Sequence, residues 1–116
     1  VLAKGQLEGG LTQALGYSLL EKINIRNGKF DADRLQTYII PTAMDTPKYD
    51  ITFVEYPISF APPGAKGVGE IPMDGLAPAI ANAIEAATGL RFTDLPITPE
   101  KVYRRMKEQS LLTAEF

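Results

Sequence analysis

Leucine recurs at every fourth position near the start of the chain. The repeat lies in GQLEGGLTQALGYSLLEK, residues 5–22, and consists of Leu7, Leu11, Leu15 and Leu19. A spacing of four places side chains one above another on a helix, where they form an apolar stripe. The pattern therefore predicts a first helix with leucines along one side.

The same segment has a second side that is polar and nearly flat. Gln6, Gly10 and Gln13 are spaced at i, i+4 and i+7, and Gly9 lies beside them. Each glycine in the middle of a helix costs about 0.5 to 1 kcal/mol relative to alanine, so two adjacent glycines need a compensating reason. Either another backbone packs very close to this side, or a ligand does.

The next part of the chain changes from helical spacing to short extended segments. INIRNGKF, residues 23–30, predicts two short strands joined at Asn27-Gly28, a dipeptide that suits the positive φ angles of a hairpin turn. YIIPTAMDTPKY, residues 38–49, contains two prolines and predicts an extended loop. DITFVEY, residues 50–56, alternates along its length and predicts a strand that is buried on at least one face.

Two more helices are expected in the second half of the chain. GLAPAIANAIEAATG, residues 75–89, predicts a helix that ends at Gly89, with Pro78 tolerable only in its first turn. Thr98 and Pro99 predict the N-cap and first residue of a third helix, which continues through KVYRRMKEQ. The predicted fold is α+β, with helices packed on a small sheet and long loops, in one domain over residues 1–116.

Composition narrows the chemistry that this chain can perform. Its 116 residues carry a formal net charge of −2 and include no Cys, His or Trp. This excludes disulfides, thiolate or imidazole metal ligands and any nucleophile–histidine pair. We assign no metal-ligating residue in this chain. A general base must be a carboxylate or a lysine with a perturbed pKa.

The sequence also indicates the cellular compartment of the protein and the kinds of partner that it does not bind. No apolar run approaches the roughly 20 residues that span a bilayer, and no signal peptide opens the chain, so we expect a cytoplasmic protein without membrane contact. Nucleic-acid binding is not expected, because the basic cluster near the end predicts the solvated face of a helix. That cluster consists of Lys101, Arg104, Arg105 and Lys107. Since the chain opens at Val1 rather than Met, we expect an excised piece of a longer protein.

Three glycines within six residues precede a single acid in GAKGVGE, residues 64–70. Glycine-rich backbone can turn its N–H groups toward one point and bind an anion or an electron-rich oxygen. The segment is neither a phosphate loop nor the dinucleotide fingerprint, and a plain turn with an exposed Glu70 fits it too. Lys66 either attracts an anionic ligand or points to solvent. Burial beside Val68 and Ile71 would raise the pKa of Glu70 toward the range useful for a base.

Two other acids have structural interpretations. Glu8 is expected on the surface or at the start of the first helix, rather than as a second catalytic group. Asp45, in the PTAMD part of the loop, is expected to be a turn residue that bonds its own backbone.

Five stretches together resemble the C-terminal part of the molybdenum-binding subunit of the xanthine dehydrogenase and aldehyde oxidase family. They are GQLEGGLTQALG at 5–16, YIIPTAMDTP at 38–47, GAKGVGE at 64–70, PAIANAI at 78–84 and LPITPEKV at 95–102. They occur in the family's order and cover nearly all of the chain. Ala14 departs from the pattern, because many members have glycine at that position. The departure affects only how tightly the helix packs there.

The resemblance implies a molybdenum hydroxylase whose cofactor is molybdenum-molybdopterin, as such or as a dinucleotide. Such enzymes hydroxylate an electron-poor carbon of a purine, another N-heterocycle or an aldehyde with oxygen derived from water. The family's general base maps onto Glu70, and its cofactor contacts map onto Gln6, Lys66, Gly67, Val68 and Gly69. The last two motifs look most like those of bacterial xanthine or heteroaromatic dehydrogenases.

The resemblance also implies partners. These are the rest of the molybdenum-binding subunit, a small-molecule substrate, and iron–sulfur and FAD groups on other domains or subunits. We then expect this chain alone to be inactive. Two alternatives remain open: a noncatalytic piece that completes a partner's site, and an independent anion-binding module that uses the glycine loop.

Overall fold

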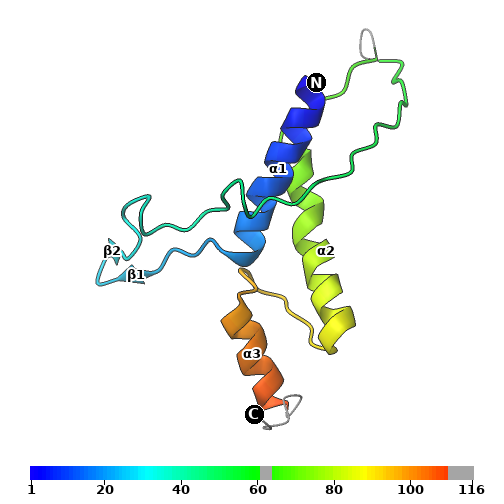
Figure 1. Ribbon diagram of the computed structural model, residues 1–116. Coiled ribbons are helices and arrows are strands. Elements are labelled where there is room, and N and C mark those ends of the chain that lie inside the picture. The colour runs from blue at the N-terminus through cyan, green and yellow to red at the C-terminus, as the bar shows by residue number, and fades with distance from the viewer. Residues whose placement is uncertain (61–63, 110–116) are drawn as a thin grey trace.

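The computed structural model describes residues 1–60 and 64–109, which form helices and one β-hairpin (Figure 1). The helices are α1, Leu2–Leu19; α2, Ile71–Thr88; and α3, Pro99–Glu108. The strands are β1, Ile25–Arg26, and β2, Lys29–Phe30, which pair antiparallel. The predicted α+β class is confirmed. No helix in the described ranges is both long and apolar enough to cross a membrane.

α1 and α2 lie side by side, and both begin at the same end of the pair (Figure 1). The buried face of α1 carries small residues, Gly10, Ala14 and Ser18, spaced four apart. The leucine stripe on its other side is only partly buried. Small side chains let two helix backbones approach closely, so this face, rather than the leucine side, forms the tightest packing. Of the flat strip expected from the sequence only Gly10 belongs to it, because Gln6, Gly9 and Gln13 are exposed.

Gly10 and Gly9 differ in their surroundings. A Cβ atom added at Gly10 would lie 2.7 Å from Pro72 Cβ, which is closer than real Cβ atoms come. A Cβ atom at Gly9 would meet nothing within 4 Å in the described part of the chain. Close packing, one of the two explanations expected for this pair, therefore holds for Gly10.

The segment after the hairpin passes across the C-terminal half of α1. A Cβ atom at Gly16 would lie 2.7 Å from Pro41 Cδ and would also meet Glu21 Oε1. The Tyr38 hydroxyl donates a hydrogen bond to the Glu21 carboxylate, which raises the pKa of Tyr38. Glycine at position 16 thus lets this segment lie directly against the helix.

Asp45 organises the loop in this segment. Its Oδ2 accepts hydrogen bonds from the Thr42 backbone N–H, at 2.8 Å, and from the Thr42 hydroxyl, at 2.7 Å. The Asp45 N–H in turn donates to the Thr42 carbonyl at 3.0 Å. The two bonds from Thr42 lower the pKa of Asp45. The predicted turn role is confirmed.

The core lies where α1 ends and the α2–α3 connection begins. Its buried residues are Leu90, Phe92 and Ile97, with Leu19, Ala81, Ile84, Leu95, Val102 and Met106 packed around them. The Ile97 N–H donates to the Ser18 carbonyl at 2.7 Å, which fastens this connection to α1. The core therefore fixes the C-terminal ends of α1 and α2 and leaves their N-terminal ends to other contacts.

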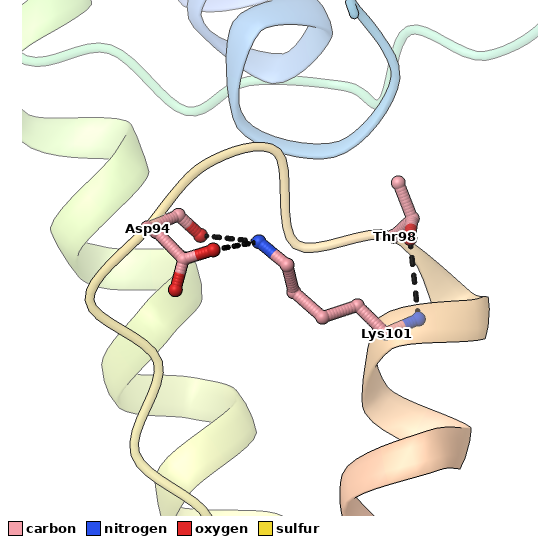
Figure 2. A network of polar contacts seen from close by, with 3 residues as sticks. All are labelled: Asp94, Thr98 and Lys101. Carbon is pink, nitrogen blue, oxygen red and sulfur yellow. Dashed lines mark hydrogen bonds and ion pairs between the residues drawn. The ribbon is translucent and has the colours of Figure 1, made fainter.

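α3 begins as predicted (Figure 2). The Thr98 hydroxyl accepts a hydrogen bond from the Lys101 N–H at 3.2 Å, and Pro99 follows the cap. Lys101 Nζ donates to the Asp94 carbonyl at 2.8 Å and also to its carboxylate, which lowers the pKa of Asp94. Arg104 pairs with Glu100 at 2.6 Å, and Arg104, Arg105 and Lys107 are exposed as predicted, whereas Lys101 is half-buried.

The hairpin also forms where it was predicted. Asn27 and Gly28 have φ angles of 51° and 76°, as a tight turn of this kind requires. Ile25 pairs with Phe30, and Arg26 with Lys29. Both strands are exposed, and the helices pack on one another rather than on this hairpin.

Two predictions about the middle of the chain are wrong. Residues 50–56 belong to no strand, because no neighbouring strand in the described residues offers hydrogen bonds to them. α2 begins at Ile71 rather than Gly75, so Pro78 lies inside the helix rather than in its first turn. Pro72, in the first two positions of α2, is the start signal that the sequence contained.

Candidate functional site

Gln6 on α1 holds the glycine loop, residues 64–70, by one hydrogen bond. Its side-chain Nε2 donates to the Gly69 carbonyl over 2.9 Å, across 63 positions of sequence. The contact is possible because α1 and α2 begin at the same end of the helix pair (Figure 1). Two stretches that were assigned to one site by resemblance therefore lie in contact.

The three glycines of the loop differ in backbone conformation. Gly64 and Gly69 have positive φ angles of 85° and 35°, a region that residues with a Cβ atom rarely adopt. Gly67 has no such φ, and a Cβ atom there would meet nothing within 4 Å in the described chain. Within residues 1–60 and 64–109, nothing requires glycine at position 67. A ligand or another segment that approached the backbone closely would require it.

Lys66 lies over an aromatic ring from the preceding segment. Its Nζ is 5.2 Å from the centroid of the Tyr56 ring, within the range of a cation–π contact. Both residues line a hollow of about 340 Å³, whose other lining residues are Val54, Glu55, Pro57 and Gly64. The Lys66 side chain is exposed, so its charge faces solvent as well as the ring. Sequence reasoning missed Tyr56, because no spacing relates it to the loop.

Glu70 ends the loop as the N-cap residue of α2. Its side chain makes no capping hydrogen bond, and the residue is exposed. The burial expected from its apolar neighbours is wrong for this chain, since Val68 is half-buried and Ile71 is 62% exposed. Any cover over the Glu70 carboxylate must come from outside the described residues.

The remaining acids stay apart from this group. Glu8 lies on the surface of α1, with its Oε1 3.7 Å from Lys4 Nζ, as expected for a helix-surface residue. Within residues 1–60 and 64–109, no three acidic side chains gather closely enough to hold a metal ion. The polar groups offered are an amide, backbone N–H groups and the Lys66 ammonium. Apart from the amide oxygen these groups are donors, which suit an anionic, oxygen-rich group better than a bare cation. The Glu70 carboxylate beside them is the acceptor of the group.

Known proteins similar to this chain are molybdenum enzymes and other oxidoreductases. Residues 1–47 match the family described as molybdopterin cofactor-binding domain. Over 97% of its length the chain is 34% identical to the xanthine dehydrogenase molybdenum-binding subunit of Escherichia coli O157:H7. Over 91% it is 37% identical to the aldehyde oxidoreductase molybdenum-binding subunit PaoC of Escherichia coli strain K12.

The fold is also shared with solved structures. The chain superposes on quinoline 2-oxidoreductase from Pseudomonas putida 86 with a TM-score of 0.84 and 34% identity over 92% of its length. It spans 14% of that protein, and 15% of each of the two relatives above. The similarity thus covers nearly all of this chain but a small share of each relative.

Proposed function

We propose that this chain, a segment of the molybdenum-binding subunit of the xanthine dehydrogenase and aldehyde oxidoreductase family, forms one wall of a molybdopterin site and supplies its general base. The observation that carries the proposal is the hydrogen bond from Gln6 to Gly69. It joins the start of the stretch that matches the cofactor-binding domain to the loop that ends in Glu70. In the complete protein, residues 1–116 are the C-terminal portion of the molybdopterin-binding domain.

The residues of this wall fit such a cofactor. Gln6 offers an amide, Lys66 offers a positive charge, and residues 66–69 offer backbone N–H groups that a bulky ligand can approach at the bare Gly67. When bound, the cofactor supplies the oxidising centre for hydroxylation of an electron-poor carbon of a purine, another N-heterocycle or an aldehyde. This chain binds and orients that group from one side.

Glu70 is the group that moves a proton. With no His or Cys in the chain, a base must be a carboxylate or a lysine, and Glu70 is the acid that adjoins the glycine loop. Its carboxylate makes no capping bond to α2, so it is available to accept a proton from the reacting oxygen. Gln6 helps to position it indirectly, by fixing the carbonyl of the residue before it.

Other groups of the complete enzyme lie outside this chain. Iron–sulfur clusters require cysteine ligands, which this chain lacks, so the clusters belong to other domains or subunits. FAD is assigned to them by resemblance to the family. An independent anion-binding module is disfavoured by shape. The radius of gyration is 18.5 Å, whereas a closed domain of this length has about 13 Å.

The test is Glu70→Gln in the complete enzyme. Glutamine keeps the size of the side chain but cannot accept the proton, so turnover should fall by about 10²- to 10⁴-fold while molybdenum content stays unchanged. Rapid-mixing reduction of the enzyme by substrate, after molybdenum has been quantified, locates the loss in the first half-reaction. Glu8→Gln is the matched control, because it makes the same chemical change on the surface of α1.

Each outcome decides the role of Glu70. A slow reduction in Glu70→Gln beside a normal rate in Glu8→Gln supports the assignment. Reduction of Glu70→Gln at the wild-type rate would show that Glu70 is a loop residue and that the base lies elsewhere in the enzyme.

A further inference from the structure

Residues 50–56 run as an extended trace outside the helix pair (Figure 1). Among the described residues, no backbone hydrogen bond involves any position from 47 to 60. Their peptide groups therefore have no backbone partner within the part of the chain that the structure describes. Yet the sequence there has the alternation and β-branched and aromatic content of a strand.

Both sides of this segment carry apolar side chains, with the polar Thr52 on one side and Glu55 on the other. In an extended backbone Phe53 points to the opposite side from Val54 and Tyr56, and these three residues are 54%, 88% and 76% exposed. Apolar residues on both sides are typical of a strand inside a sheet, with both faces covered. Covering them removes water from the peptide groups between them, and those groups then need hydrogen-bond partners. For an extended segment the partner that satisfies them in series is another strand.

The partner that the comparisons favour is the remaining polypeptide of the same subunit. The chain matches only 14% to 15% of the length of its relatives, so most of each relative lies outside the matched part. The superposition with a TM-score of 0.84 extends over 92% of this chain, so its overall shape recurs inside a much longer protein. A strand of that same polypeptide is held at high local concentration, which a separate molecule is not.

We propose that residues 50–56 form a β-strand by pairing with a strand from the rest of the same subunit. This pairing would anchor the connection that leads from the hairpin to the glycine loop, close to Tyr56 and Lys66. The inference rests on the proposed function only in that it takes the complete molybdenum-binding subunit as the context of this chain.

The test is amide hydrogen exchange in the complete enzyme, followed by mass spectrometry of peptides that cover residues 47–60. Paired amides in residues 51–56 should exchange at least about 100-fold more slowly than the rate for free peptide. Proline substitutions then test the pairing, because proline removes one N–H from a ladder. Thr52→Pro and Glu55→Pro affect opposite edges of a strand, so at least one of them should restore fast exchange around it. Lys48→Pro, outside the segment, is the matched control and should leave the protection intact.

The outcomes separate this inference from the proposed function. Fast exchange of residues 51–56 in enzyme that retains molybdenum overturns the strand and leaves the proposed function standing. Protection that disappears on dilution to the monomer would assign the pairing to a second copy and overturn the choice of partner. Slow exchange in an enzyme whose Glu70→Gln variant reacts normally would support the strand and count against the proposed base.

Discussion

Gly9 and Gly10 are neighbours on α1, but the space around them differs. A side chain at Gly10 would collide with Pro72, whose ring cannot turn aside, whereas Gly9 has open space beyond it in the described chain. In a helix, both positions pay the same conformational cost for lacking a side chain. Packing against α2 therefore compensates that cost at Gly10, whereas no contact in the described residues does so at Gly9.

Alanine substitutions distinguish the two positions. Gly10→Ala should lower the free energy of unfolding, because overpacking against Pro72 costs about 1 to 3 kcal/mol and outweighs a gain of about 0.5 to 1 kcal/mol in helix propensity. Gly9→Ala, the matched control, should show that gain alone. Urea unfolding of this chain measures both. Equal stabilisation by the two substitutions would mean that α1 and α2 do not pack closely at Gly10.

At the scale of elements, local chemistry determined α3 and the hairpin. The cap at Thr98 and the turn at Asn27-Gly28 depend on a few adjacent residues, and both formed where the sequence predicted them. Lys101 links this cap to the connection between α2 and α3, which carries Ile97. Its backbone N–H donates to the Thr98 hydroxyl, and its side-chain Nζ donates to the Asp94 carbonyl (Figure 2).

The cap at Thr98 should make a measurable contribution to stability. Thr98→Ala removes the hydroxyl that accepts from the Lys101 N–H, and such a loss typically costs about 1 kcal/mol. Thr98→Ser keeps an acceptor at the same position and should retain most of that stability. Thermal unfolding of both variants is the measurement. If serine were as destabilising as alanine, the loss would come from the threonine methyl group rather than from the cap.

Features that depend on distant parts of the chain were harder to predict. The leucine repeat predicts a helix correctly, but it does not say which side meets α2, and the side with Gly10 proved to be the buried one. Residues 50–56 have the composition of a strand, but a strand also requires a partner. The start of α2 was placed late, because Pro78 was taken as a first-turn residue and Pro72 was overlooked.

For the candidate site, the residues could be named from the sequence, but their contacts could not. Gln6 and residues 66–70 came from resemblance to a family, and the residue patterns alone favoured a plain turn. The hydrogen bond from Gln6 to Gly69 could not be foreseen, because it depends on α1 and α2 lying parallel across 63 positions of sequence. The contact between Lys66 and Tyr56 depends on the fold in the same way.

The whole molecule has the dimensions of a part rather than of a closed domain. It extends over 60 × 37 × 27 Å, and large apolar side chains along residues 39–60 are exposed. The buried core is confined to one end, around Leu90 and Ile97, while the glycine loop lies by the other end of the helix pair. The proposed site is thus built on the less enclosed end of the chain.

This geometry predicts that the chain by itself retains no molybdenum cofactor. A site that holds a small ligand tightly encloses about 70 to 90% of its surface, whereas here Lys66, Gly67, Gly69 and Glu70 are all exposed. One open wall contributes a few hydrogen bonds, and these compete with water in a solvated loop. After incubation with cofactor and gel filtration, the 116-residue chain should carry well under one molybdenum per molecule by elemental analysis. The complete subunit, treated identically, is the positive control, and its Glu8→Gln variant should match it. Stoichiometric molybdenum on the isolated chain would show that this wall encloses its ligand unaided, and the rest of the subunit would then be needed for substrate rather than for the cofactor.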